Sequence, residues 1–154
     1  MQLQLATWQE IDAYLKRSTA VLIPIGSTEQ HGPNGFIGTD AIFPEFLAKS
    51  IGERTGALVA PTLSIGMAQH HLGFSGSITL RPTTLIAVVQ DVVNSLARHG
   101  FDRFWFLNGH GGNIASVNAA FSEIYAESSL GTASSNRPSL ICRLKNWWET
   151  PGVQ

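Results

Sequence analysis

The fold is decided by the stretch RFWFLNGHGGN, residues 103–113, which passes from an apolar run into a polar, glycine-rich loop. Its first half, residues 103–107, predicts a buried strand, and residues 108–113 predict a loop. Apolar side chains then recur at helical spacing, which predicts a helix over residues 114–127. The stretch is therefore a strand, a loop and a helix in succession, the repeating unit of a parallel α/β sheet.

The same succession is found on both sides of this stretch. A Thr7–Glu10 capping box predicts a short helix after Thr7. The remaining predictions are a strand at 20–25, a loop at 26–39, a helix from about Asp40 to Thr55 ended by Gly56, a strand at 58–60, a loop at 62–77, a helix capped by Thr83 or Thr84 and ended by Gly100, and a strand at 139–144. Alternating strands and helices predict the α/β class, with helices on both faces of a parallel sheet.

Three polar loops follow strands 20–25, 58–60 and 103–107. In parallel α/β sheets, ligands bind outside the carboxyl ends of the strands. The three loops are therefore expected to converge at one edge of the sheet and to form the functional site there.

The composition limits the classes of protein that this chain can represent. It has 154 residues, a length that suits one domain, with 10 Lys and Arg against 11 Asp and Glu, and a net charge of −1. Hydrophobic residues make up 44%, which excludes disorder, and the lack of net positive charge disfavours general nucleic-acid binding. Charged residues make up 14%, against about 25% in ordinary soluble domains, which suggests surface buried against another chain or against missing residues.

The single cysteine, Cys142, cannot form an internal disulfide and lies in an apolar run typical of a buried strand. The N-terminus lacks the basic and long apolar regions of a signal peptide. No apolar run approaches the roughly 20 residues of a membrane span. We therefore expect a cytoplasmic protein without a membrane segment.

The first loop holds Glu29, His31 and Asp40. In an extended segment Glu29 and His31 point to the same side, and a carboxylate beside an imidazole favours a divalent metal site. Asp40 fits two roles, as a metal ligand or as the N-cap of the following helix.

The third loop places His110 among three glycines at the end of a strand, which favours a metal ligand that a bound group can approach closely. The pair Gly111 and Gly112 could instead hold a phosphate at a helix N-terminus, although the Lys-Ser/Thr of a P-loop is missing.

The second loop holds His70 and His71, which would point to opposite sides of an extended chain. Either could move protons near neutral pH, and we favour His71 as the catalytic or substrate-contacting one. No Gly-x-Ser-x-Gly elbow is present, so metal-activated water is a simpler mechanism than covalent catalysis.

Together, these loops resemble the creatininase (creatinine amidohydrolase) family. The resemblance rests on EQHGP at 29–33 with GTD at 38–40, HLGFSGS at 71–77 and NGHGGN at 108–113. It implies a three-layer α/β/α sandwich with a mostly parallel sheet, and two divalent ions, Zn²⁺, Mn²⁺ or both. It further implies hydrolysis of a non-peptide or cyclic amide C–N bond in a small substrate, and a homo-oligomer, often a hexamer.

Residue by residue, the resemblance implies that Glu29, His31, Asp40 and His110 are the metal ligands, with Asp40 bridging the two ions. His71 matches a histidine of the middle motif, and we predict that it is catalytic.

The chain departs from the family pattern at several positions. Gly112 stands where creatininase itself has a Glu ligand, Ser75 where Pro is usual, Ser77 where Thr is usual, and His70 where an acidic residue is common. Members with the NGHGGN form take a carboxylate from a later HAGE motif, which does not occur before Gln154. We therefore expect one creatininase-like domain over residues 1–154 that lacks the C-terminal part of the family pattern.

Two hypotheses about function follow. The first is a metal-dependent amidohydrolase in which metal-activated water attacks an amide carbon. The second is a non-catalytic metal- or ligand-binding domain, inactive because a carboxylate ligand is missing. Trp147 and Trp148 either line a substrate pocket or form a surface that the missing part would cover.

Overall fold

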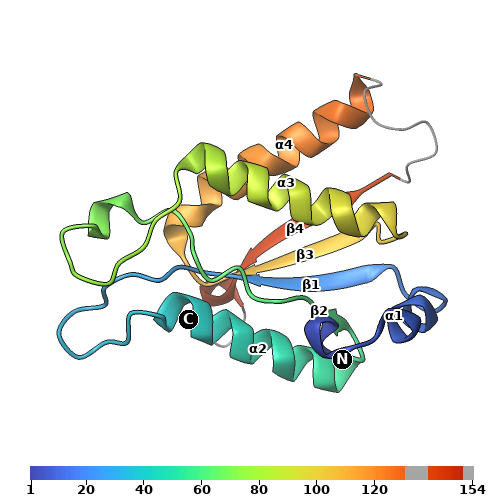
Figure 1. Ribbon diagram of the computed structural model, residues 1–154, viewed down its shortest axis with the longest axis horizontal. Coiled ribbons are helices and arrows are strands. Elements are labelled where there is room, and N and C mark those ends of the chain that lie inside the picture. The colour runs from blue at the N-terminus through green and yellow to red at the C-terminus, as the bar shows by residue number, and fades with distance from the viewer. Residues whose placement is uncertain (131–138, 151–154) are drawn as a thin grey trace.

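The structure is a computed structural model, and it describes residues 1–130 and 139–150 (Figure 1). Its sheet has four parallel strands in the order β2-β1-β3-β4. Their bounds are β1 Ala20–Ile25, β2 Leu58–Val59, β3 Arg103–Asn108 and β4 Ile141–Asn146. The register pairs Ile25, the last residue of β1, with Asn108 of β3, and Asn108 with Asn146 of β4. Strands β1, β3 and β4 therefore end level at one edge of the sheet.

Helices cover both faces of this sheet. Figure 1 shows α3 (Pro82–Arg98) and α4 (Ile114–Ser129) on one face and α2 (Thr39–Thr55) on the other, with α1 (Trp8–Leu15) near the amino ends of the strands. Four short 3₁₀ turns complete the described elements: η1 Leu3–Leu5, η2 Gln69–His71, η3 Gly111–Asn113 and η4 Trp147–Glu149. The predicted three-layer α/β/α architecture with a parallel sheet is confirmed.

The helix boundaries follow local chemistry. Thr7 and Glu10 form the predicted capping box at the start of α1, and Gly56, with φ of +76°, ends α2 as predicted. The prediction that Thr83 or Thr84 caps α3 is wrong, because the helix begins earlier, at Pro82. Proline suits the first helical position, since its φ is preset and its missing N–H would have no partner there. Among the described residues, no helix is long and apolar enough to cross a membrane.

The main hydrophobic core lies between the sheet and the α3–α4 layer. It includes Leu85, Val89, Val93, Val117, Ile124, Phe104 and Phe106, all fully buried. Cys142 is buried in the same core, which confirms its predicted place in a strand. Phe104 and Phe106 of β3 are buried in this core, and β3 leads into the loop that contains His110.

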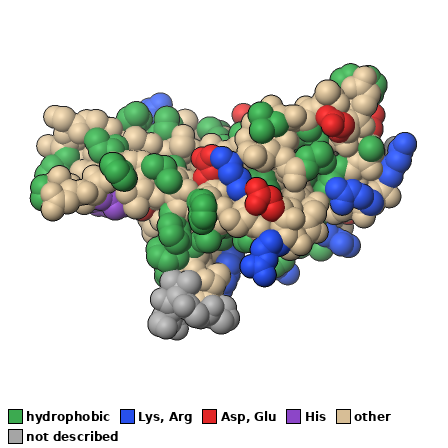
Figure 2. Space-filling model, turned by 90° about the horizontal axis from the view of Figure 1, so that it is seen from below, with side chains coloured by type: hydrophobic (Ala, Val, Ile, Leu, Met, Phe, Trp, Pro, Cys, Tyr) green, Lys and Arg blue, Asp and Glu red, His purple; other side chains and the backbone are tan. Residues whose placement is uncertain are grey.

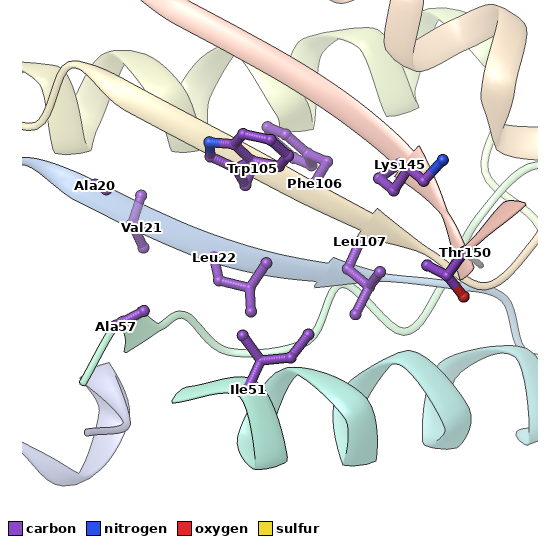
Figure 3. A pocket seen from close by; sticks show the side chains of 10 residues that line it. All are labelled: Ala20, Val21, Leu22, Ile51, Ala57, Trp105, Phe106, Leu107, Lys145 and Thr150. Carbon is purple, nitrogen blue, oxygen red and sulfur yellow. The ribbon is translucent and has the colours of Figure 1, made fainter. Parts of the chain in front are cut away.

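The opposite face is less completely covered. An apolar groove of about 400 Å³ lies between α2 and the sheet, where Leu22, Ile51 and Leu107 face one another (Figure 3). Trp105 on β3 borders the groove and is 50% exposed. From this side the surface shows many hydrophobic side chains, with charged side chains mostly toward one end (Figure 2).

Candidate metal centre

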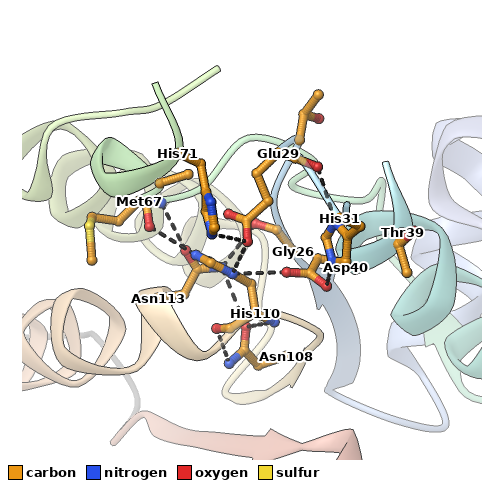
Figure 4. A network of polar contacts seen from close by, with 12 residues as sticks. Gly26, Glu29, His31, Thr39, Asp40, Met67, His71, Asn108, His110 and Asn113 are labelled. Atoms are coloured by element: carbon orange, nitrogen blue, oxygen red, sulfur yellow. Dashed lines mark hydrogen bonds and ion pairs between the residues drawn. The ribbon is translucent and has the colours of Figure 1, made fainter. Parts of the chain in front are cut away.

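The loops that follow β1, β2 and β3 meet at the carboxyl edge of the sheet, as predicted (Figures 1 and 4). Figure 4 shows that they bring together side chains that are far apart in the sequence. The side chains in contact are the four predicted metal ligands and the predicted catalytic histidine: Glu29, His31, Asp40, His71 and His110.

Two glycines allow Asp40 to reach this edge. A Cβ atom on Gly26 or on Gly109 would lie 2.0 Å from the backbone oxygen of Asp40, closer than real Cβ atoms come. These residues follow β1 and β3 directly, so the first turn of α2 packs against the ends of both strands. Glycine at both positions is what places the Asp40 carboxylate over the edge of the sheet.

The Asp40 carboxylate lies between two imidazoles. Its Oδ1 is 2.9 Å from His31 Nε2, and its Oδ2 is 2.9 Å from His110 Nδ1. The helix-cap alternative for Asp40 is wrong, because Gly38 occupies the N-cap of α2. Burial raises the pKa of Asp40, but hydrogen bonds with His110 and His31 outweigh it and lower the pKa below its ordinary value. Asp40 is therefore a charged carboxylate with one oxygen toward each histidine.

Each of these histidines also contacts a backbone carbonyl. His31 Nδ1 is 3.0 Å from the oxygen of Glu29, and His110 Nε2 is 2.8 Å from the oxygen of Met67. Each ring can therefore donate one N–H to a carbonyl and turn its other nitrogen toward Asp40. Metal-binding histidines are held in this way, with the second N–H fixed by a carbonyl or carboxylate.

Without a metal, both nitrogens of each ring face acceptors, which favours the doubly protonated imidazolium. Burial lowers the pKa of His110, but the Asp40 hydrogen bond, the Met67 carbonyl and the charge of Glu29 outweigh it, so the pKa is raised. The pKa of His31 is raised as well: burial lowers it, and the Glu29 carbonyl and Asp40 together outweigh burial.

These raised pKa values predict that the metal-free chain becomes less stable as the pH rises. A histidine with a raised folded pKa stabilises fully below its unfolded value, about 6.5, and this stabilisation is lost as the pH passes the folded value. The lowered pKa of Asp40 changes the free energy of unfolding only at acidic pH, so it does not oppose the loss of stability above neutrality.

Urea unfolding in the presence of a chelator, between about pH 6 and 9, measures this dependence. The free energy of unfolding should fall across the range. His110→Gln should flatten the curve, and replacement of the exposed His99 should not. A wild-type curve that is flat or rises with pH would contradict the prediction.

Glu29 has a buried carboxylate that is only partly satisfied. The residue is 4% exposed, and its Oε1 lies 3.3 Å from both His110 Nδ1 and His71 Nε2. Its Oε2 is buried without a hydrogen-bond partner among the described residues. A buried oxygen of this kind is costly unless a cation or a donor meets it.

The donor set fits a divalent cation. Glu29, His31 and Asp40 each offer a ligand atom within 4.8 Å of the others, and His110 Nδ1 faces both carboxylates. Imidazole nitrogens and carboxylate oxygens together suit Zn²⁺ and are also compatible with Mn²⁺. The structure therefore places all four predicted ligands where they could hold metal.

The two histidines of the second loop lie side by side, which differs from the prediction. His70 and His71 are in the 3₁₀ turn η2, not in an extended chain, and their ring centroids are 4.1 Å apart. His71 contacts Glu29, whereas the exposed His70 lies parallel to the ring of His110 at 6.4 Å. His71 is thus the member of the pair that touches the candidate ligands.

Sequence reasoning missed the residues that join the three loops. The side chain of Asn108 binds both backbone groups of His110. It accepts a hydrogen bond from the His110 N–H at 3.1 Å and donates one to the His110 carbonyl at 2.7 Å. Asn113 donates to the oxygen of Gly26 and accepts from the backbone N–H of Met67. Asn108 is the last residue of β3 and Asn113 the last residue of η3, and their place at the two ends of this loop is the only signal the sequence gives for them.

The tryptophans near the C-terminal end of the described chain lie outside this network. The Trp147 ring packs on Phe43 of α2 at 4.3 Å between centroids, and Trp148 meets Trp147 edge-on. Both tryptophans are half-buried, so their predicted role at a substrate pocket or under a further segment stays a prediction.

Known proteins resemble the chain over most of its length. The family model described as creatininase, creatinine amidohydrolase, matches residues 4–153. Creatinine amidohydrolase of Pseudomonas putida is 39% identical over 110 residues, which cover 68% of this chain and 42% of that protein. The 3-dehydro-scyllo-inosose hydrolase of Thermotoga maritima is 33% identical over 109 residues, covering 70% and 35%. The mycofactocin precursor peptide peptidase of Mycobacterium ulcerans is 32% identical over 117 residues, covering 70% and 46%.

Solved structures of creatininases also resemble this chain. A structure named creatininase Mn superposes with a TM-score of 0.85 at 29% identity, covering 96% of this chain and 58% of that chain. A mutant creatininase of Zn-Zn type gives 0.85 at 27% identity, covering 97% and 60%. A mutant creatininase complexed with creatine gives 0.85 at 28% identity, covering 96% and 58%. The chain thus spans less than half of the curated relatives and 58% to 60% of these solved chains.

Proposed function

The chain belongs to the creatininase family, and from that premise we propose that it is a metal-dependent amidohydrolase whose centre holds two divalent cations, Zn²⁺, Mn²⁺ or both. One observation carries the proposal: the Asp40 carboxylate lies between two histidines whose other nitrogens face backbone carbonyls. The buried Oε2 of Glu29, which has no partner among the residues that the structure describes, supports it.

The residues divide into two groups around Asp40. His110 Nδ1, Glu29 Oε1 and Asp40 Oδ2 lie on one side, and His31 Nε2 and Asp40 Oδ1 lie on the other. Bound divalent cations would supply Lewis-acid chemistry, polarising an amide carbonyl and activating water. Asp40 would then bridge the two positions, and the buried Glu29 would be a ligand on the His110 side.

His71 is the proposed catalytic residue. Its side chain is 21% exposed, so it lies at the border between the buried carboxylates and solvent. Its Nε2 is the nitrogen that faces the cluster, 3.3 Å from Glu29 Oε1. A proton held at this atom is placed to move to or from a group bound beside Glu29.

The proposed substrate is a small amide with a non-peptide or cyclic C–N bond. The name creatinine amidohydrolase supports this class, whereas the names of the two other relatives refer to an inosose and to a precursor peptide. Self-association is part of the proposal. It is supported by the charge-poor composition and by exposed aromatic residues such as Phe36, 81% exposed, and Phe46.

A second candidate is a metal-binding domain without catalysis. The number of donors favours it, since two cation positions would have to share the four described side chains Glu29, His31, Asp40 and His110. Each position would then have fewer protein donors than the three or four of ordinary zinc sites, unless carboxylates bridge both.

Metal analysis of the purified chain tests the proposal. About two divalent ions per chain, with amidase activity lost on chelation, would support it. His110→Ala should lose bound metal, and the matched control His99→Ala, at the exposed end of α3, should keep it. One ion without turnover would favour the second candidate, and unchanged metal content in His110→Ala would overturn the ligand assignment.

A further inference from the structure

Gln30 lies between the candidate ligands Glu29 and His31, and its side chain makes two contacts whose directions are fixed. Its Oε1 is 2.8 Å from the backbone nitrogen of Gly32, and its Nε2 is 2.9 Å from His71 Nδ1. A backbone N–H can only donate, so the amide oxygen of Gln30 must face Gly32. The amide NH₂ therefore faces His71.

The Gln30 amide determines which nitrogen of His71 carries the proton. An amide NH₂ can only donate, so His71 Nδ1 must accept and cannot itself hold a hydrogen. The proton of the neutral ring is then on Nε2. This nitrogen lies 3.3 Å from Glu29 Oε1, within ion-pair distance of the carboxylate.

The contact from His71 helps to orient Glu29. Glu29 Oε1 meets His71 and His110, whereas Oε2 is buried without a partner among the described residues. The close approach of His71 Nε2 to Oε1 limits rotation of the carboxylate. Ligating carboxylates are usually held by a polar partner outside the metal, and loss of such a partner weakens metal binding by about 10–100-fold.

We propose that Gln30 is a positioning residue that fixes the Nε2–H tautomer of His71 and, through it, holds Glu29 in the orientation that binds metal. Only the second part of this inference, that Glu29 is held in the orientation that binds metal, rests on the proposed function. His71 in this form presents a donor to the cluster and no lone pair, so it is not a metal ligand through Nε2.

Nitrogen NMR of the imidazoles tests the tautomer directly in the metal-free chain, above neutral pH. His71 should show a bare Nδ1 and a protonated Nε2, with its signals assigned by their loss in His71→Gln. Gln30→Glu places an acceptor against Nδ1, so this nitrogen should gain a proton. Gln30→Met, which neither donates nor accepts, should leave a mixture of the two tautomers. A protonated Nδ1 in the wild type, or an unchanged ring in both variants, would overturn the proposal.

Metal affinity tests the second half. Gln30→Met should bind metal about 10–100-fold more weakly than the wild type. The exposed Gln69, on the same turn as His71, provides a control. Gln69→Met should bind as the wild type does, and thermal unfolding of both metal-free variants checks that they fold. Wild-type affinity in Gln30→Met would overturn the positioning role.

The two kinds of failure are distinguishable. A wild type that binds no metal overturns the proposed function, while the tautomer measurement is unaffected because it uses the metal-free chain. A wild type that binds metal but shows the wrong tautomer overturns only the role of Gln30.

Discussion

Replacement of Asp40 by Asn is expected to abolish retention of divalent metal while the metal-free chain stays folded. The two oxygens of this carboxylate face different histidines, each at 2.9 Å. An Asn side chain has the same shape but carries one oxygen and one NH₂, so one histidine would face a donor instead of an acceptor. Loss of a residue that only hydrogen-bonds a metal ligand lowers the metal affinity by up to about 100-fold. Because Asp40 would be a direct ligand of both ions, its replacement should lower the affinity by more than this.

Calorimetric titration and elemental analysis measure the effect of Asp40→Asn. Asp91→Asn is the matched control, since it makes the same change of charge on the exposed surface of α3. Added metal at about 100 times its Kd should raise the unfolding free energy of the wild type and the control by about 2.7 kcal/mol for each ion bound, and that of Asp40→Asn hardly at all. Metal retention equal to the control would show that Asp40 is not the bridging ligand.

Most of the fold could be predicted because its signals are local. The apolar runs at 20–25 and 103–107 became β1 and β3, and the helical spacing after Ile114 became α4. The predicted start of α3 is wrong because two sequence signals compete there. Threonine favours the N-cap, but Pro82 fits the first helical position and moved the start of the helix ahead of Thr83.

The candidate site could be predicted in its residues but not in its contacts. Convergence of loops at the carboxyl edge follows from a parallel sheet, so the sequence alone is enough to group Glu29, Asp40 and His110. The carbonyl of Met67 could not be predicted, because any residue has the same backbone oxygen. The side chain of His71 is turned toward Glu29 by a 3₁₀ turn, and the sequence carries no clear signal for that turn.

Replacement of Gly112 by Ala is expected to weaken metal binding by about 10–100-fold, although Gly112 is not a ligand. A Cβ atom there would lie 2.3 Å from His110 Nε2 and 2.5 Å from the oxygen of Met67, the two atoms of the hydrogen bond that orients His110. One of them must move, and forced overpacking of this kind costs about 1–3 kcal/mol of stability.

Gly111→Ala is the matched control, because it lies in the same turn, η3, and its Cβ atom would meet no atom of the described part of the chain within 4 Å. Metal titration and urea unfolding of the two variants should separate them clearly. Equal behaviour of Gly111→Ala and Gly112→Ala would mean that the contact between His110 and Met67 does not support the site.

The same geometry predicts the outcome for Gly112→Glu, which adds a carboxylate at the position where the family resemblance implies a Glu ligand. The new side chain must leave the backbone through the space that His110 Nε2 and the Met67 oxygen occupy. It can supply a ligand only by displacing the ring of His110, which lies between Asp40 and Glu29. Gly112→Glu should therefore bind metal more weakly than the wild type, as Gly112→Ala does. Tighter binding would show that the loop can rearrange, and that its glycine reflects a lost ligand and not a packing requirement.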